Sequence, residues 1–174
     1  MYLSIQHACT LHPGALDIHI NDAIEHIGQE TLDEQQGRQF LKQSYLTQGM
    51  LDLVREGFKR LSGGKGGHPV FRLKQAMGGG KTHLLKTMAF LVRHPALRTE
   101  FFSTSASQYV FGAVQVTFFN GREQPNDFFW GRIASELGYS QFFGGGPQAP
   151  GLDRWNALFQ KLSGPTLIML DEMP

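Results

Sequence analysis

The sequence predicts an α/β fold in which helices cover a mostly parallel sheet. Strand-like runs alternate with helix-like segments from residue 70 onward. The unbroken apolar run at 166–170 suits a strand that is buried on both faces. We therefore expect a three-layer α/β/α core with an N-terminal helical segment. This divides the chain into a helical lead with a glycine-rich linker, 1–67, and a layered part, 68–174.

The helical lead contains two predicted helices, at 33–45 and 47–61. Thr47 can cap the second helix at its start, and Gly63 can end it. Its apolar residues share one face: Leu51, Val54, Phe58 and Leu61. Two weaker features precede these helices, a turn and a helix start: Pro13–Gly14 and Asn21–Asp22.

The layered part begins after the flexible linker 62–67. The strands expected in it are 70–73, 113–119 and 166–170. The helices expected in it are 82–93, 128–137 and 153–162. The first of these helices carries an apolar stripe of Leu85, Met88, Ala89 and Val92. His94-Pro95 then stops the helical pattern, because the residue before a proline is biased away from helical geometry.

A glycine run, Gly78-Gly79-Gly80, followed by Lys81-Thr82, stands between a predicted strand and a predicted helix. Glycine permits main-chain conformations in which backbone N–H groups surround phosphate oxygens, as in a P-loop. Lys81 would reach the terminal phosphates of a nucleotide, and the Thr82 hydroxyl would hold a magnesium ion. The alternative is a flexible turn that happens to precede Lys-Thr, since Gln75 stands where the usual pattern places a glycine.

A second motif follows this loop by about ninety residues, where the apolar strand at 166–170 ends in Asp171-Glu172. Asp171 would bind the magnesium ion, directly or through water, and Glu172 would polarise a water against the terminal phosphate. An apolar strand that ends in two acids is by itself common, and surface charge is the alternative. The combination of the loop with the acidic strand end indicates a Walker A and a Walker B element.

The bulk composition excludes several classes of protein. A net charge of +1 and a charged fraction of 18% show no strong attraction to nucleic acid or to a membrane surface. The single cysteine, Cys9, excludes an internal disulfide and fits a reducing compartment. We see no membrane-spanning run and no signal sequence, so we expect a cytoplasmic protein. The seven histidines show no metal-ligand spacing, and His83 is a candidate either for contact with a nucleotide or for a capped or packed position.

Several stretches together, and in this order, resemble a known family. They are Phe40 to Met50, Arg60 to Gly63, Gly78 to His83, Phe129 to Ala134 with Leu137-Gly138, and Leu170 to Glu172. They resemble the N-terminal part of a bacterial and archaeal family of AAA-type P-loop ATPases, catalogued as domain of unknown function 499. Members of that family often lie near restriction and anti-phage genes. The absence of the early glycine is also typical of the family.

The resemblance implies an ATPase that acts on or beside DNA, with a nuclease or DNA-modifying partner. It carries the phosphate-loop role to Lys81 and Thr82, and the expected nucleotide-binding residues are Gly78, Gly79, Gly80, Lys81, Thr82 and His83. It carries the magnesium role to Thr82 and Asp171, and the catalytic role to Glu172. The implied cofactors are ATP and Mg²⁺.

The chain ends two residues after Glu172, whereas members of the family are longer. In AAA-type sheets another strand lies between the two motif-bearing strands, so we expect an incomplete P-loop core, a truncated or split-gene fragment. Such a chain would be completed by a continuation chain or by a homo-oligomer. Three functions stay open: a working ATPase, a non-hydrolysing remnant that acts as a binding module, and a kinase-like transferase.

Overall fold

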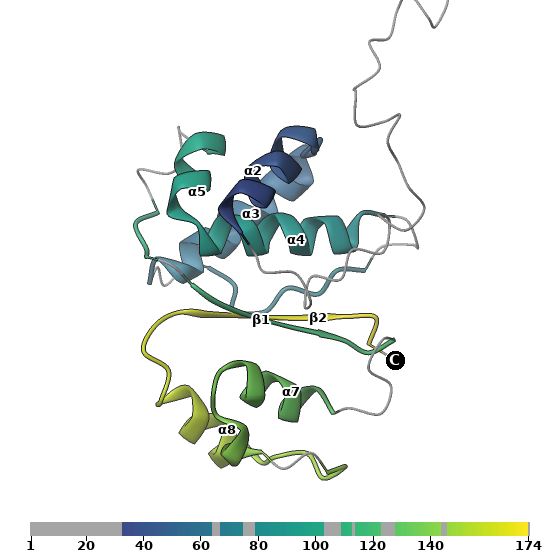
Figure 1. The fold of residues 1–174 in the computed structure, drawn as a ribbon, viewed down its shortest axis with the longest axis vertical. Helices are drawn as coiled ribbons and strands as arrows, with labels where there is room; N and C mark the ends of the chain where they lie inside the picture. Colours follow the sequence, from purple (N-terminus) through teal and green to yellow (C-terminus); the bar gives the residue numbers. More distant parts are fainter. Residues whose placement is uncertain are drawn as a thin grey trace, which may run out of the picture.

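The computed structural model describes residues 33–63, 67–74, 79–102, 109–112, 114–122, 128–143 and 146–173. These ranges contain two strands, six α-helices and a short 3₁₀-helix, and four of the helices precede the first strand (Figure 1). In chain order they are α2 (Glu34–Gln43), α3 (Gln48–Leu61), α4 (Lys81–Arg93), α5 (Pro95–Phe101), β1 (Gln115–Asn120), α7 (Phe129–Glu136), η3 (Ser140–Phe142), α8 (Leu152–Phe159) and β2 (Thr166–Asp171).

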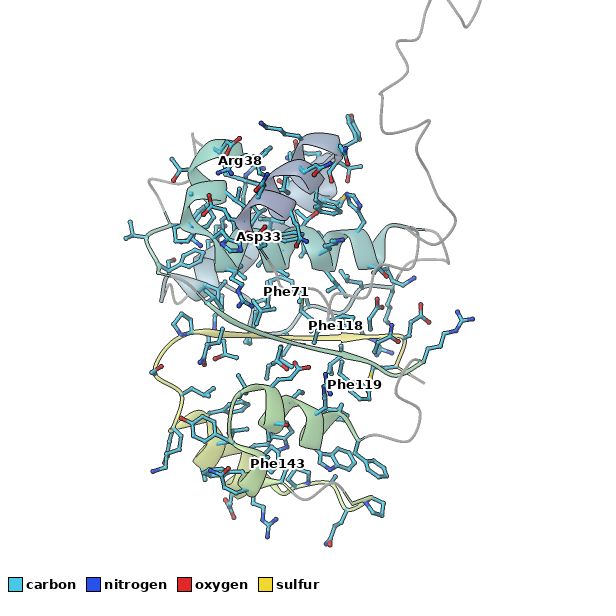
Figure 2. The ribbon with its side chains drawn as sticks, in the orientation of Figure 1. Asp33, Arg38, Phe71, Phe118, Phe119 and Phe143 are labelled. Atoms are coloured by element: carbon cyan, nitrogen blue, oxygen red, sulfur yellow. The ribbon has the colours of Figure 1, made fainter. Side chains whose placement is uncertain are left out.

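The two strands pair in parallel, from Gln115 opposite Thr166 to Asn120 opposite Asp171. Helices α2 to α5 lie over one face of this sheet, and α7 and α8 lie over the other (Figure 1). Successive side chains of a strand point to opposite faces, so Phe118 joins the core beneath α4 while the ring of Phe119 lies 6.3 Å from that of Phe129 on α7 (Figure 2). The prediction of an α/β fold with a parallel sheet is confirmed.

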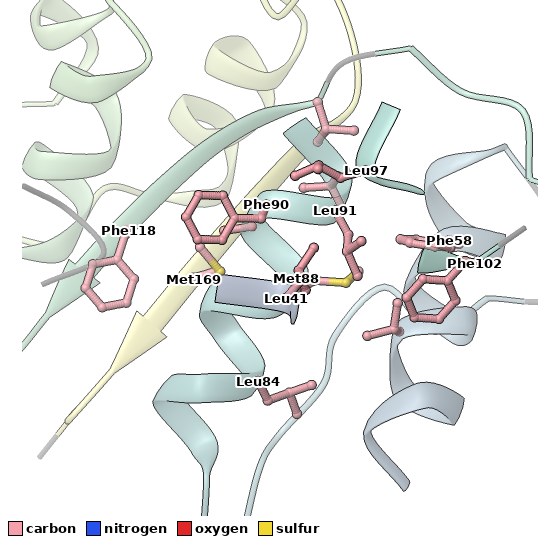
Figure 3. Packing of buried hydrophobic residues seen from close by; sticks show 14 residues of the cluster. Leu41, Phe58, Leu84, Met88, Phe90, Leu91, Leu97, Phe102, Phe118 and Met169 are labelled. Atoms are coloured by element: carbon pink, nitrogen blue, oxygen red, sulfur yellow. The ribbon is translucent and has the colours of Figure 1, made fainter. Parts of the chain in front are cut away.

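Helix α4 lies at the centre of the larger core (Figure 3). It is buried around its whole circumference from Leu84 to Val92, except at the half-buried Leu85. A helix that is buried on all sides needs partners on all sides. Helices α2, α3 and α5 and the sheet supply them, so α4 is buried more widely than the single predicted stripe.

The smaller core lies between the sheet and the α7–α8 layer. Its fully or nearly buried members are Ile133, Ala134, Leu137, Phe143 and Leu158. The hydroxyl of Tyr139 donates to the carbonyl oxygen of Lys161 at 2.9 Å and so ties the end of α7 to the segment after α8. The two cores cover both faces of the sheet, but β2 is less buried than predicted: Thr166, Leu167 and Ile168 are half-buried, and Leu170 is 40% exposed.

Local sequence signals set most of the helix boundaries. The side chain of Thr47 accepts a hydrogen bond from the backbone N–H of Met50 (3.4 Å), and Gly63 has a positive φ of 80° just beyond α3. Both features match the predicted cap and stop. Helix α4 ends at Arg93 as predicted, but Pro95 then begins a further helix, α5, that was not predicted. Proline is well suited to the first turn of a helix, where its missing N–H costs nothing.

The predicted strand at 70–73 is wrong. Residues 67–74 contain no strand, and the side chains of Val70 and Phe71 are 79% and 38% exposed. An extended segment becomes a strand only when a neighbour completes its hydrogen bonds. The described sheet consists of β1 and β2 alone. Residues 67–74, which lead to the glycine loop, therefore pair with neither strand.

Several predictions lie outside the described residues: the turn at Pro13–Gly14, the helix start at Asn21–Asp22, Cys9, Gln75 and Gly78. Among the helices that the structure describes, none combines the length and the apolar character that a bilayer crossing requires.

Candidate functional site

The glycine loop leads directly into the N-terminus of the buried helix α4. Gly80 is the N-cap residue of this helix and adopts a left-handed conformation, with φ 77° and ψ 19°. Glycine takes up this conformation without the steric cost that a Cβ would cause. Gly79 and Gly80 are both exposed, and Lys81 is half-buried as the first residue of the helix. Gly79 and Gly80 therefore present their backbone, beside a helix N-terminus, to the outside of the protein.

The two predicted motifs meet at a direct hydrogen bond. The Oγ1 atom of Thr82 donates to Oδ2 of Asp171 at 2.8 Å, although the two residues are 89 positions apart. Asp171 is the last residue of β2, and only 6% of its surface is exposed. Its other carboxylate oxygen, Oδ1, accepts the backbone N–H of Glu172 at 3.0 Å. The structure thus places the first turn of α4 against the acidic end of β2.

Glu172 stands beside this contact in an unusual backbone conformation. Its φ of 48° lies in the left-handed region. Among the described residues, no other residue apart from glycines has a positive φ. Such a conformation costs of order 1–3 kcal/mol and persists only where the surroundings hold it. The residue is exposed, so its carboxylate lies at the surface next to the buried Asp171.

His83 is packed against the helical lead. Its ring lies 4.7 Å from the ring of Phe40 on α2, and its carbonyl oxygen accepts the hydroxyl of Thr87 at 2.9 Å. Phe40 also lies 5.0 Å from the ammonium group of the buried Lys86. Sequence reasoning did not single out Phe40 as a neighbour of the loop. The apolar residues of α2 indicate that this helix packs against another element, but the sequence does not show that this element is α4.

The donor set at Thr82 and Asp171 fits a magnesium ion. Mg²⁺ prefers oxygen ligands, and it commonly uses one or two protein side chains while phosphate oxygens and waters complete its shell. A hydroxyl and a carboxylate in hydrogen-bond contact are groups of this kind. In the described part of the chain, no group of three or more His, Cys, Asp or Glu side chains is placed so that it could hold a metal ion.

A cavity of about 200 Å³ lies in the other helical layer, between the α7–α8 side chains and the loop before α8. Trp130, Phe143 and Arg154 contribute to its wall. The indole nitrogen of Trp130 is buried and has no hydrogen-bond partner among the described residues. Because α7 and α8 cover the opposite face of the sheet from α4, this cavity is separate from the loop at the start of α4 (Figure 1).

The fold and this geometry define an α/β protein in which a Gly-Lys-Thr loop opens a buried helix opposite the acidic end of a parallel strand. The model of the DUF499 N-terminal domain matches residues 21–107, and the chain belongs to that family. The match includes α2 to α5 and the glycine loop, and it ends before β1. Comparison with curated proteins and with solved structures gave no match.

Proposed function

We propose that this chain binds ATP with Mg²⁺ at the loop formed by residues 78–82, as the nucleotide-binding part of an AAA-type P-loop ATPase. The observation that carries the proposal is the 2.8 Å hydrogen bond between Thr82 and Asp171. A Gly-Lys-Thr loop alone fits many turns, and an acidic strand end alone is ordinary surface charge. Their direct contact supports the proposal, because P-loop NTPases hold Mg²⁺ with the loop Ser/Thr and with the Asp of the acidic strand.

Each residue has a distinct part in the proposed site. The backbone of Gly78 to Gly80 and the N-terminus of α4 would surround phosphate oxygens, and Lys81 would contact the terminal phosphates. Thr82 and Asp171 would hold the ion, which when bound neutralises charge on the phosphate oxygens. Glu172 would orient a water for attack. His83, fixed against Phe40, would lie beside the nucleotide.

Binding without turnover is the second candidate, and the segment that precedes the loop favours it. Residues 67–74 lie outside the sheet, and Val70 is 79% exposed. Hydrolysis depends on groups held rigidly in place, because preorganised charges supply most of the stabilisation. Because residues 67–74 are not hydrogen-bonded into the sheet, although Leu73 packs against the larger core, we favour binding over catalysis as the second candidate. A DNA-modifying or nuclease partner, a second copy or continuation chain, and a role in phage defence are further proposals that rest on the family resemblance.

Equilibrium titration with ATP, with and without Mg²⁺, tests the proposal. Lys81→Ala should weaken binding about tenfold or more, because a charged hydrogen bond contributes about 1.5–3 kcal/mol. Lys161→Ala is the matched control, since this exposed lysine lies after α8. Thr82→Ala should remove the advantage that Mg²⁺ gives, whereas Thr99→Ala, on the exposed face of α5, should not.

Two outcomes separate the candidates. Magnesium-dependent ATP turnover that disappears in Lys81→Ala would establish the ATPase, and binding without turnover would establish the second candidate. Absence of binding at millimolar ATP with Mg²⁺ would refute both.

A further inference from the structure

The turn after β1 lies directly against the backbone of the acidic pair. The N–H of Gly121 donates to the carbonyl oxygen of Asp171 at 3.0 Å, which extends the pairing of the two strands by one residue. A Cβ built on Gly121 would stand 2.6 Å from the carbonyl oxygen of Glu172 and 3.4 Å from its carbonyl carbon. Real Cβ atoms essentially never approach backbone so closely. Only glycine fits at position 121 with Glu172 in its present place.

The backbone of Glu172 is therefore held from two sides. Its N–H donates to Oδ1 of Asp171, and its carbonyl group lies against the bare Cα of Gly121. These two contacts explain how a residue other than glycine keeps a φ of 48°. A left-handed conformation is retained only where its surroundings leave no cheaper alternative.

The same carboxylate connects this backbone to the glycine loop. Oδ1 of Asp171 accepts from Glu172, while Oδ2 accepts the hydroxyl of Thr82. A side chain at position 121 would displace the Glu172 carbonyl, change the direction of the Glu172 N–H, and so turn the carboxylate that faces Thr82. Thr82 thus contacts the Asp171 carboxylate directly, and Gly121 is linked to the same carboxylate through the backbone of Glu172.

We propose that Gly121 is a positioning residue for the Asp171–Glu172 pair: it lets the turn after β1 close on the Glu172 backbone and thereby sets the carboxylate toward Thr82. The role assigned to this geometry in magnesium binding rests on the proposed function. The mechanical connection itself is a property of the protein without any ligand, so the two can be tested apart.

A double-mutant cycle without ligand tests the connection. Gly121→Ala should lower the urea midpoint, and at least half of that loss should disappear when Glu172 is replaced by glycine. A glycine at 172 can adopt other backbone angles and move its carbonyl away from the new methyl group. Gly164→Ala is the matched control: it precedes β2, a Cβ there meets nothing within 4 Å, and it should show no coupling to Glu172→Gly.

If Gly121→Ala does not fold, recovery of folding in the double variant supports the proposal, and failure of both variants to fold overturns it. Equal losses in the two backgrounds also overturn it, because Gly121 would then act independently of Glu172.

Nucleotide titration tests the consequence for the site. Gly121→Ala should weaken binding of Mg²⁺-ATP about tenfold, a typical coupling between residues in contact, while binding of ATP in EDTA changes by less than about twofold. Equal weakening in both conditions would overturn the positioning role. If the unaltered protein binds no ATP, the proposed function fails, and the ligand-free cycle alone decides whether Gly121 positions the acidic pair.

Discussion

Replacing Arg98 with methionine removes a buried guanidinium that ties the α4–α5 corner to the segment entering β1. Its Nη1 donates to the carbonyl oxygens of Leu91 and Val92 at 3.0 Å each. In a continuous helix the Leu91 carbonyl would accept the N–H four residues on, but that residue is Pro95, which has none. Arg98 supplies the donor that the proline lacks.

The second nitrogen of the same group serves the segment before β1. Nη2 of Arg98 donates to the carbonyl oxygens of Phe111 (2.5 Å) and Gly112 (3.3 Å), and the guanidinium carbon lies 3.9 Å from the centre of the Phe111 ring. Arg98 is 5% exposed, and burial lowers its pKa. The guanidinium nevertheless stays protonated through the neutral range, so the effect of its removal should not vary between about pH 6 and 9.

The expected loss follows from the acceptors that would be left behind. The carbonyl oxygen of Val92 would still accept the N–H of Val114 at 3.2 Å, and the hydrogen bond from Arg98 to Gly112 is already long. The carbonyl groups of Leu91 and Phe111 are therefore the two that lose a good donor. A hydrogen bond to a charged group contributes about 1.5–3 kcal/mol, so the two together give a loss of about 3–6 kcal/mol in the free energy of unfolding. This is a large part of the total of about 5–15 kcal/mol that a domain usually has.

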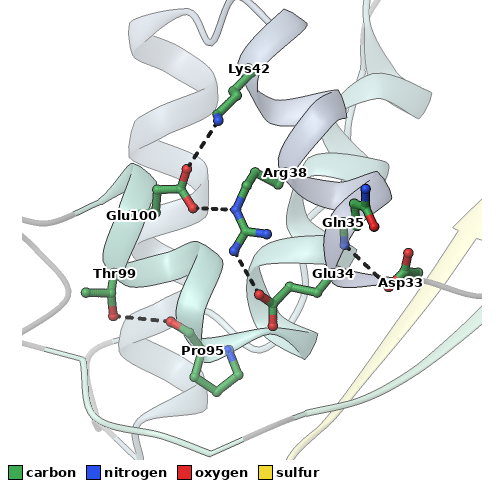
Figure 4. Close-up of polar contacts among 8 residues, drawn as sticks. All are labelled: Asp33, Glu34, Gln35, Arg38, Lys42, Pro95, Thr99 and Glu100. Carbon is green, nitrogen blue, oxygen red and sulfur yellow. Dashed lines mark hydrogen bonds and ion pairs between the residues drawn. The ribbon is translucent and has the colours of Figure 1, made fainter.

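Urea denaturation of Arg98→Met, followed by tryptophan fluorescence, measures this loss. Both tryptophans, Trp130 and Trp155, belong to the α7–α8 layer, whereas Arg98 lies in the layer on the other face of the sheet. A single transition that shifts to lower urea, with an unchanged dependence of the unfolding free energy on urea, would therefore also show that the two layers unfold together. Arg38→Met is the matched control. Its half-exposed guanidinium contacts Glu34 and Glu100 at 2.8 Å each (Figure 4), and water and salt screen such pairs. Equal losses in the two variants would refute the reasoning.

Two further predictions concern contacts that the fold makes without a ligand. Gly37→Ala should destabilise the protein by about 1–3 kcal/mol in urea denaturation, because its Cβ would lie 2.6 and 2.8 Å from buried side-chain atoms. Gly57→Ala should cost less, since its Cβ meets only the flexible end of Met88, and the reverse order would contradict this. Glu136→Ala should cost about 2 kcal/mol and reduce the hydrogen-exchange protection of the Phe118 amide, because Oε2 of Glu136 accepts this N–H at 3.0 Å. Unchanged protection would show that another group covers this edge of β1.

Sequence patterns predicted those elements whose stability is local or periodic. Helix α3 is an example: its cap at Thr47, its apolar face and its stop at Gly63 all act within a few residues. The strand β2 was predicted because a continuous apolar run has few alternatives in a layered fold. The meeting of Thr82 with Asp171 does not follow from a local pattern, because the strand expected to lead into the glycine loop is not part of the sheet and the contact depends on how α4 packs against the end of β2.

Other features depend on partners that no local pattern names. The run at 70–73 has the composition of a strand, but without a paired neighbour its backbone remains outside the sheet. Helix α5 was missed because Pro95 was taken only as a stop, whereas Arg98 lies one turn further on to satisfy the carbonyl that the proline leaves. The role of Gly121 depends on the exact approach of Glu172, which sequence alone does not reveal.

The position of the candidate site depends on the helical lead as much as on the sheet. Phe40 of α2 lies between the ring of His83 and the ring of Phe90, 4.7 and 5.7 Å away, and so contacts both the first and the third turn of α4. Leu41 and Phe58 belong to the same core as α4. The division at residue 67 stays a prediction about sequence organisation, and the core extends across it. Because α4 carries Thr82 toward Asp171, residues that pack α4 from the lead side also determine where that hydroxyl lies relative to the end of β2.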